Sequence, residues 1–366
     1  MLVLSVPSVY SVVKIAVMRL LLVIALLAVT ASAQWTKHDV GTTASFRGLS
    51  AVSEKVVWAS GTNGTVIRSV DGGKTWDVNI VPGGEKLDFR DIEAFDEDEA
   101  YILSIGNGGD SQILHTTNGG TIWENQFTNK DPKAFFDAIA CWDRNNCIAM
   151  SDPVDNKFVL IATNDGGFHW KYLDTSKMPA AKKGEAAFAA SGTCLITQGK
   201  NNAFIVTGGT DARVFKSTDR GKSWRVYNTP LTKGTAGSGI FSIAMRDALN
   251  GVTVGGNYEK PTEGKKTFAV TRDGGRTWRQ GTDLFGYRSA IAFLSPKMMI
   301  AVGSSGANYT ATGGKYWQMF DPGEYNAIDV AHYGKHSAIT WVVGAKGTVR
   351  SLDTYDVRKD DWGEVW

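Results

Sequence analysis

The stretch Ser69-Val70-Asp71-Gly72-Gly73-Lys74-Thr75-Trp76 reads S-x-D-x-G-x-T-W, and this eight-residue box returns along the chain. The box decides the fold, because regular self-similarity is the sequence signature of a repeat architecture. The further copies are Thr116/Asn118/Gly120/Trp123, Thr163/Asp165/Gly167/Trp170, Ser217/Asp219/Gly221/Trp224, Thr271/Asp273/Gly275/Trp278 and, with Thr312 in place of the acid, Thr310/Gly314/Trp317. A seventh start at Ser351-Leu352-Asp353 has Tyr355 and Arg358 where the glycine and the tryptophan are expected.

The boxes recur about every 47 residues, so residues 34–366 accommodate seven units. Each unit contains four short apolar runs separated by turn residues, and helical periodicity is absent, which excludes an α-solenoid. We therefore predict an all-β, seven-bladed β-propeller of four-stranded antiparallel blades with Asp-box turns. An aromatic residue opens each unit: Phe46, Phe89, Phe136, Phe188, Phe241, Tyr287 and Tyr325.

The seventh box lacks its tryptophan, and Trp35 stands at the matching distance before Phe46. We predict that residues 34–40 form the outer strand of the last blade and close the ring, which pairs an otherwise exposed strand edge. Residues 34–366 would then be one propeller with a C-terminal tail over residues 353–366. Closure by Trp362 or Trp366 is the alternative.

The N-terminus has the order of a secretory signal peptide. Arg19 precedes an apolar run from Leu20 to Ala28, and Ala31-Ser32-Ala33 supplies small residues for cleavage before Gln34. We expect residues 1–33 to be removed and the protein to be exported, either periplasmic or secreted. The start codon can be Met1 or Met18, and a membrane anchor is the alternative for this segment. No later apolar stretch approaches the roughly 20 residues of a membrane span.

Three cysteines are present, and two of them flank a turn-like segment. Cys141 and Cys147 can face each other across a hairpin and form a disulfide in an oxidising compartment. The alternative is that both, like Cys194, are small buried hydrophobic residues. Scattered histidines and the absence of C-x-x-C spacing argue against a metal site.

Composition and charge exclude several classes of protein. The chain is 43% hydrophobic and 21% charged, which fits neither disorder nor a coiled coil. Its net charge of +2 comes from Lys14 and Arg19, so residues 34–366 hold 37 basic and 37 acidic residues. A neutral chain argues against a nucleic-acid partner. No G-x-G-x-x-G follows a strand and no haem motif occurs, so we expect no cofactor.

The box residues are expected to be structural. A short acidic or amide side chain in a turn accepts hydrogen bonds from backbone N–H groups, glycine allows positive φ, and tryptophan buries a large ring. These structural positions are Asp71, Trp76, Asn118, Trp123, Asp165, Trp170, Asp219, Trp224, Asp273, Trp278 and Trp317.

A binding site is expected at the mouth of the central channel. The residue after each opening aromatic recurs at one height, and three arginines there suit a carboxylate, sulfate or phosphate, which guanidinium binds bidentately. The alternative is that the arginines only pair with Asp91, Asp137 and backbone carbonyls. The candidate residues are Arg47, Arg90, Asp137, Ser242, Arg288 and Asn326, with Glu185 and Tyr258 on the rim and Ala189 completing the series.

The boxes resemble those of Asp-box (bacterial neuraminidase repeat) propellers. Over nearly all of residues 34–366 the chain is similar to the group related to the plant photosystem II stability/assembly factor. Further segments carry this resemblance to exported bacterial members: 151–153 (SDP), 184–192 (GEAAFAASG), 238–244 (SGIFSIA) and 286–290 (GYRSA). The resemblance implies assistance to the assembly or stability of an exported or membrane complex.

Two function classes follow. The first is a non-catalytic, monomeric binding propeller with a protein or peptide partner, or an anionic small ligand, at the channel mouth. The alternative is a sialidase-like or other Asp-box glycoside hydrolase. Phe46-Arg47-Gly48-Leu49 departs from the R-I-P segment of sialidases, and seven units exceed their six blades. Other Asp-box glycosidases need two nearby carboxylates, for which Asp137 and Glu185 are conceivable.

Overall fold

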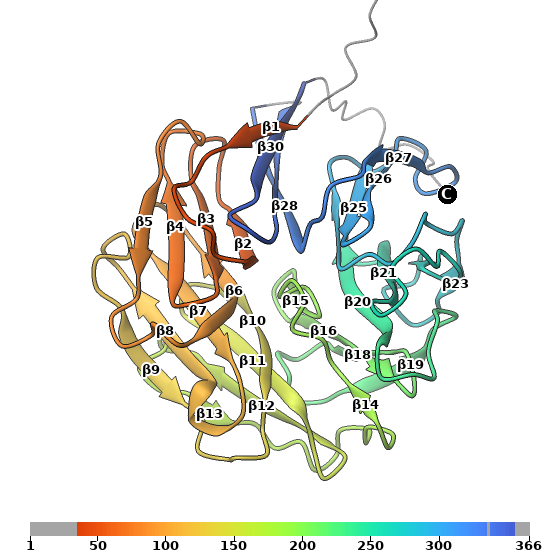
Figure 1. Ribbon diagram of the computed structural model, residues 1–366. Coiled ribbons are helices and arrows are strands. Elements are labelled where there is room, and N and C mark those ends of the chain that lie inside the picture. Colours follow the sequence, from red (N-terminus) through yellow and green to blue (C-terminus); the bar gives the residue numbers. More distant parts are fainter. Residues whose placement is uncertain (1–34, 335–336, 356–366) are drawn as a thin grey trace, which may run out of the picture. The chain divides into compact units, whose positions relative to one another are not determined.

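Seven antiparallel sheets form a ring in the computed structural model, which describes residues 35–334 and 337–355 (Figure 1). The chain divides into residues 1–35 and 36–366, and the second unit is the propeller. The predicted signal peptide, residues 1–33, lies outside the described residues. The first strands contact one another in the order β2, β6, β10, β15, β20, β24, β28 and back to β2. The predicted seven-bladed propeller is therefore confirmed.

The strands follow the expected order within each unit. Blade 1 contains β2 (Phe46–Ala51), β3 (Val57–Gly61), β4 (Thr65–Ser69) and β5 (Asp77–Ile80); blade 2 contains β6 (Asp88–Ala94), β7 (Ala100–Ile105), the 3-10 turn η1 (Gly108–Asp110), β8 (Gln112–Thr116) and β9 (Glu124–Thr128). Blade 3 contains β10 (Phe136–Asp143), β11 (Asn146–Val154), β12 (Lys157–Thr163) and β13 (Lys171–Tyr172); blade 4 contains β15 (Leu195–Gln198), β16 (Asn202–Val206), β18 (Arg213–Ser217) and β19 (Arg225–Asn228).

The remaining blades complete the ring. Blade 5 contains β20 (Ser238–Met245), β21 (Gly251–Asn257), β22 (Phe268–Thr271) and β23 (Arg279–Gln280), and two short strands, β14 (Glu185–Ala186) and β17 (Gly208–Gly209), extend its inner edge. Blade 6 contains β24 (Ala290–Phe293), β25 (Met299–Gly303), β26 (Gly306–Thr310) and β27 (Gln318–Asp321); blade 7 contains β28 (Ala327–Tyr333), β29 (Ser337–Val343), β30 (Val349–Tyr355) and β1 (Thr36–His38).

The N-terminal strand closes the ring, as predicted. Strand β1 pairs antiparallel with β30, with Thr36 opposite Ser351 and His38 opposite Val349, and the two strands lie together in Figure 1. Trp35, directly before β1, is only 5% exposed. Because β30 continues to Tyr355, residues 353–355 are strand and not the start of a tail. The alternative residues Trp362 and Trp366 lie outside the described residues.

The strand pairing of blade 7 shows that its degenerate Asp-box does not begin at Ser351, where the sequence analysis placed it. Arg68, one residue before the box of blade 1, pairs with both Trp58 and Asp77. In blade 7 the residue that pairs with both Trp341 and Thr36 is Ser351. Ser351 therefore takes the place of Arg68, and the true start of the degenerate box is one residue later than expected. In this register Trp35 precedes Thr36 as Trp76 precedes Asp77.

Each Asp-box turn is held by its own side chains. Asp71 Oδ1 accepts hydrogen bonds from the backbone N–H groups of Lys74 (3.0 Å) and Thr75 (2.9 Å), and its Oδ2 accepts from Thr75 Oγ1 (2.6 Å). Ser69 Oγ accepts from the Gly73 N–H (2.8 Å). The same bonds lower the pKa of Asp71 from 3.8 to about 2. The acid thus organises the turn.

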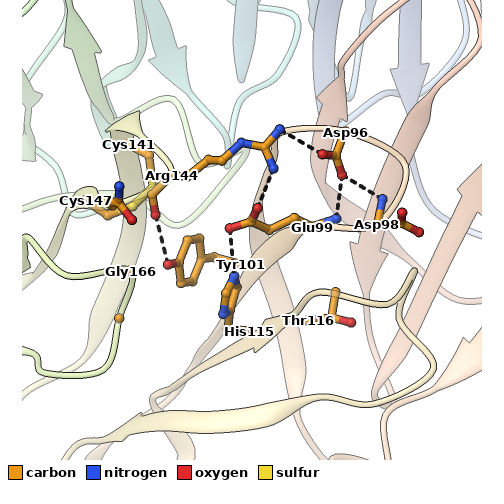
Figure 2. A network of polar contacts seen from close by, with 12 residues as sticks. Asp96, Asp98, Glu99, Tyr101, His115, Thr116, Cys141, Arg144, Cys147 and Gly166 are labelled. Atoms are coloured by element: carbon orange, nitrogen blue, oxygen red, sulfur yellow. Dashed lines mark hydrogen bonds and ion pairs between the residues drawn. A yellow bond between two sulfur atoms is a disulfide. The ribbon is translucent and has the colours of Figure 1, made fainter.

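A polar network joins blades 2 and 3 at the Asp-box end (Figure 2). Arg144 on the β10–β11 turn forms ion pairs with Asp96 (2.8 Å) and with Glu99, and the Tyr101 hydroxyl donates to the Arg144 carbonyl (3.1 Å). His115 stacks on Tyr101, with ring centroids 4.2 Å apart, and contacts Glu99. This network fixes one blade against the next.

A disulfide joins Cys141 and Cys147 directly across the β10–β11 hairpin that carries Arg144. The third cysteine, Cys194, is a buried free thiol. Within the described part of the chain, no helix has the length and apolar character needed to cross a bilayer.

Removal of the closing strand tests the ring. A chain that begins at Gly41 should melt about 10 °C lower or more than one that begins at Gln34, because β30 loses its partner and one buried Trp contributes about 3–5 kcal/mol. Differential scanning calorimetry measures the shift. A chain ending at Tyr355 is the control and should melt as the full chain does. A large loss in that control and none in the first variant would support closure by Trp362 or Trp366.

The box carboxylate can be tested by acid sensitivity. Asp71→Asn keeps the acceptor, as Asn118 does in blade 2, where its Oδ1 accepts from the Ile122 N–H (2.9 Å). We expect Asp71→Ala to melt lower than Asp71→Asn at pH 7. A carboxylate with a lowered pKa stabilises the fold above about pH 4, and this stabilisation is lost as the pH falls towards 2. Melts from pH 7 to pH 3 should therefore fall less steeply in Asp71→Asn than in the wild type, and equal slopes would contradict this assignment.

Candidate functional site

A cavity of about 510 Å³ opens where the first strands of the blades begin. Its lining comes from six of the seven blades and from the link that precedes blade 4, so it lies at the mouth of the central channel. Five of the eight candidate residues line it, namely Arg47, Arg90, Asp137, Tyr258 and Asn326. The other lining residues are Phe135, Asp152, Ala187, Phe188, Ala189, Ala190, Phe241, Tyr287, Ser289, Ser304 and Tyr325.

Residues 187–193, here called the axial segment, cross the channel below this mouth. The expectation that Phe188 opens the first strand of blade 4 is wrong, because β15 begins only at Leu195. Phe188 instead stacks on Phe241 of blade 5, with ring centroids 3.9 Å apart and planes 5° apart. Ala189 consequently presents its backbone carbonyl to the channel and does not continue the series of first-strand residues.

Hydrogen bonds from several blades hold the axial segment in place. Arg47 Nη1 of blade 1 donates to the Ala190 carbonyl (3.2 Å), and Arg90 Nη1 of blade 2 donates to the Ala189 carbonyl (3.3 Å). On the other side, Ser191 Oγ donates to a blade 6 carbonyl (3.0 Å). The segment therefore forms the floor of the cavity and orients both arginines.

The two arginines differ in how their charge is compensated. Arg90 Nε forms an ion pair with Asp88 Oδ2 at 2.8 Å. Arg47 has no carboxylate within ion-pair distance among the described residues. Burial and the neighbouring Arg90 lower the pKa of Arg47, but guanidinium stays protonated at neutral pH. Arg47 is thus the cation of the cavity whose charge no ion pair with a described residue compensates, and it is available to an anion that enters the mouth.

Two carboxyl groups line the same side of the cavity. Asp137 is 1% exposed, and its Oδ2 has no hydrogen-bond partner among the described residues. Burial, followed by the nearby Asp152, raises the pKa of Asp137 well above its ordinary value. Burial also raises the pKa of Asp152 to about 6, although its Oδ1 accepts from the Ala187 N–H (2.7 Å). Burial and the proximity of the two carboxyl groups therefore favour one shared proton over two negative charges.

Aromatic rings form a second part of the cavity lining. Tyr258, on the loop after β21, is 48% exposed and meets Phe188 and Phe241 edge-on at 6.4 Å and 6.2 Å. Tyr287 contacts Phe241 edge-on at 4.7 Å. The mouth thus has a charged half from blades 1 to 3 and an aromatic half from the axial segment and blades 5 and 6.

Three candidate residues lie outside the cavity lining, which corrects the sequence-based expectation. Glu185 is a structural acid: its Oε1 accepts from Arg213 Nε (2.9 Å) and Thr207 Oγ1 (2.6 Å), all buried. Ser242 Oγ accepts from Thr193 Oγ1 (2.7 Å) of the axial segment. Neither can reach a ligand at the mouth.

Arg288 is the third exception. It is fully buried, and its Nη1 donates to the Tyr287 carbonyl (2.6 Å) and to Ser305 Oγ (2.8 Å). Burial lowers the pKa of Arg288 to about 10. The inner strand of blade 6 begins only at Ala290. Arg288 therefore precedes this strand and does not share the height at which Arg47 and Arg90 lie in theirs. The three expected arginines therefore do not all meet at the mouth: Arg47 and Arg90 line the cavity, and Arg288 does not.

The sequence analysis placed Tyr258 at the rim but missed Phe188, Phe241, Tyr287 and Asp152 as lining residues. A signal for these residues existed, because Asp152 and Tyr287 lie in two of the segments that carry the family resemblance. Asn326 lines the mouth and also donates from Nδ2 to the Phe46 carbonyl (2.8 Å), which links blade 7 to blade 1. Within the described residues, no cluster of three His, Cys, Asp or Glu side chains could hold a metal ion.

Comparison with known proteins supports the resemblance drawn from the boxes. Residues 27–173 match the family model described as Photosynthesis system II assembly factor YCF48. A structure described as YCF48 bound to D1 peptide is 17% identical with a TM-score of 0.62 and covers 87% of this chain and 97% of its own. YCF48 from Cyanidioschyzon merolae is 16% identical with a TM-score of 0.62 and covers 87% of this chain and 99% of its own. The expected relation to the photosystem II assembly factor-related propellers is confirmed.

A glycoside hydrolase also shares the fold. The Niastella koreensis GH74 enzyme is 14% identical with a TM-score of 0.59, and the match covers 86% of this chain and 53% of the enzyme. At this identity the likeness concerns the fold alone. No curated protein sequence matches the chain.

The carboxyl pair can be tested through its pH dependence. An acid whose pKa is raised by folding destabilises the protein increasingly as the pH rises above its unfolded value near 3.8. Asp137→Asn removes this penalty, so its melting temperature relative to the wild type should rise from pH 4 to pH 8. Thermal melts across that range measure the difference. A difference that is constant with pH would show that Asp137 ionises normally.

Proposed function

We propose that this propeller is a non-catalytic binding protein whose channel mouth takes a peptide or protein segment that presents an anionic group. The match to the YCF48 family model supports an assembly or binding role. A structure of the related YCF48 is described as bound to D1 peptide, which supports a peptide as the class of partner.

The observation that carries this proposal is the uncompensated Arg47 in the mouth. Arg47 is half-buried, so part of its hydration is lost without an ion-pair partner to replace it. Guanidinium binds carboxylate or phosphate through two parallel hydrogen bonds, so an anionic partner would supply the missing counter-charge. Arg47 Nη1 is held by the Ala190 carbonyl, which leaves the rest of the fork for a ligand. The axial segment thus pre-orients the group that would bind the anion.

The aromatic half supplies the second element of recognition. Phe188, Phe241 and Tyr258 present ring faces and edges beside the charged half, and Tyr258 is exposed at the rim. Aromatic rings contribute large apolar contact area at low entropic cost, which suits an apolar side chain next to an acidic one. A cavity of about 510 Å³ accommodates a few side chains and not a folded domain.

We further propose that the protein acts outside the cytoplasm as a monomer, after removal of residues 1–33. The signal-peptide pattern at the N-terminus and the Cys141–Cys147 disulfide both support an oxidising compartment. In that setting it would assist the assembly or stability of an exported or membrane complex.

Glycoside hydrolysis is the second candidate, favoured by the Asp137–Asp152 pair in a cavity on a fold shared with a GH74 enzyme. Against it, Asp137 is almost fully covered, and burial raises the pKa of its carboxyl, which disfavours the ionised form that a nucleophile or a base requires. Glu185, the other conceivable carboxylate, is committed to Arg213.

Binding of acidic peptides tests the proposal. An array of short peptides that combine an aromatic residue with Asp, Glu or phosphoserine should yield binders, and Arg47→Ala should weaken them by roughly 10–100-fold, as expected for losing a charged hydrogen-bonded contact. Fluorescence anisotropy measures the affinity, and Arg279→Ala, an exposed site far from the mouth, is the control.

Aryl glycosides and sialosides should be assayed in parallel. Turnover that Asp137→Asn abolishes, together with binding that is indifferent to Arg47→Ala, would replace the binding function with the enzymatic one.

A further inference from the structure

The Asp-box turns and the turns between the first two strands of each blade lie together on one face of the ring, here called the Asp-box face. The backbone N–H of Gly72 donates to the Lys55 carbonyl (2.9 Å) in blade 1, and that of Gly274 donates to the Leu249 carbonyl (2.7 Å) in blade 5. Corresponding bonds occur in blades 2, 3, 4 and 6. This face is opposite the channel mouth, where the first strands begin.

Charge is divided unequally over the Asp-box face. In blades 4–6 the turns hold eleven Lys or Arg and three Asp; they are residues 198–202, 216–225, 246–250, 270–279, 294–298 and 309–318. In blades 1–3 the equivalent turns hold five Lys or Arg and ten Asp or Glu; they are residues 52–56, 68–77, 95–99, 115–124, 142–146 and 162–171. Although residues 34–366 have no net charge, the part of the Asp-box face formed by blades 4–6, here called the basic half-face, is strongly basic.

The cations of the basic half-face include exposed side chains that form no ion pair with a described residue. These six are Lys200, Lys222, Arg225, Arg276, Arg279 and Lys315. The acids among them are engaged locally. Asp219 accepts from Ser223 (2.5 Å from its Oγ), and Asp273 accepts from Thr277 (2.7 Å from its Oγ1). The basic charge is thus directed to the solvent.

Apolar side chains project among these cations. Leu249, on the β20–β21 turn, is 57% exposed, and Tyr316, in the box of blade 6, is 73% exposed. A hollow of about 220 Å³ in blade 5 is large enough for a phosphate group. Two arginines, Arg272 and Arg279, line it together with Val270, Thr277 and Asp273, whose carboxylate accepts from Thr277 Oγ1. These features match the headgroup region of a lipid bilayer. The cations of the three blades suit anionic headgroups, the hollow suits a phosphate group, and Leu249 and Tyr316 suit the interface between the headgroups.

We propose that the Asp-box face of blades 4–6 docks onto a lipid bilayer that contains anionic headgroups. The cations bind the negative surface, and Leu249 and Tyr316 enter the interface between the headgroups. The acidic turns of blades 1–3 are repelled, so the ring stands tilted with the channel mouth facing away from the bilayer. A partner bound at the mouth would then be held near a membrane surface.

A bilayer fits this surface better than an acidic protein or a nucleic acid. Flexible Lys and Arg tips on separate turns can each find a mobile headgroup, whereas a rigid polyanion would demand a fixed spacing of charges. Exposed Leu249 and Tyr316 would gain nothing from a phosphate backbone, but they are stabilised in the interfacial region of a bilayer.

Co-sedimentation with vesicles tests the proposal. Vesicles of phosphatidylcholine with about one third phosphatidylglycerol should bind the protein at low salt, and pure phosphatidylcholine vesicles should not. Reversal of three tips (Lys222→Glu, Arg276→Glu and Lys315→Glu) should lower vesicle affinity by about 100-fold or more, since each basic residue near the surface contributes about 1 kcal/mol. Leu249→Ser with Tyr316→Ser should weaken binding while leaving its salt dependence unchanged.

The matched control reverses three cations on the same face of the other half-ring: Lys55→Glu, Lys74→Glu and Lys171→Glu. This variant carries the same change of net charge and should bind anionic vesicles within a few-fold of the wild type. Equal losses in both triple variants would overturn the proposal, because binding would then follow net charge alone. Failure to bind anionic vesicles, or tighter binding to polyglutamate or to a DNA duplex at the same ionic strength, would also overturn it.

Discussion

The ring depends on hydrogen bonds that pass from the first strand of one blade to the first strand of the next. Asp91 Oδ2 on β6 accepts from the Ile139 N–H on β10 (2.8 Å), and Asp329 Oδ2 on β28 accepts from the Ala51 N–H on β2 (2.7 Å). Burial raises the pKa of Asp91 to about 7, whereas the N–H groups act in the opposite direction. Because a buried N–H without a partner is costly, these donors are satisfied only in a closed ring.

Aromatic contacts also join one blade to the next, further from the axis. Trp58 on β3 meets the box tryptophan of blade 2, Trp123, edge-on at 6.4 Å, and Trp341 on β29 meets the box tryptophan of blade 1, Trp76, at 5.7 Å. The second contact spans the joint where the chain closes, and His38 of β1 lies 4.9 Å from Trp341 in the same cluster. Closure is therefore secured by packing as well as by the pairing of β1 with β30.

The repeat made the blade number, the box turns and the closing strand predictable, since each rests on local residue types at a fixed spacing. The site was only half predictable. Arg47 and Arg90 follow their opening aromatics in regular first strands, whereas blade 4 leaves the pattern: Phe188 opens no strand and stacks on Phe241. Glu185 could not be judged from sequence, because its partner Arg213 lies 28 residues away and only the fold brings them together.

The axial segment explains how a neutral propeller can present two unlike surfaces. By crossing the channel below the mouth, it turns the upper opening into a cavity with its own floor, so that Arg47 belongs to the mouth alone. In the Asp-box turns at the other end, the residue directly after the glycine of the S-x-D-x-G-x-T-W box supplies no side-chain hydrogen bond to the turn and is free to vary. The next residue donates its hydroxyl to the acid in blades 1, 4 and 5. Lys222, Arg276 and Lys315 occupy this variable position in blades 4–6. Lys74 occupies it in blade 1, and the uncharged Thr121 and Phe168 occupy it in blades 2 and 3. The same repeat that enforces the fold thus leaves one exposed side chain per blade at which charge can accumulate without a cost in stability.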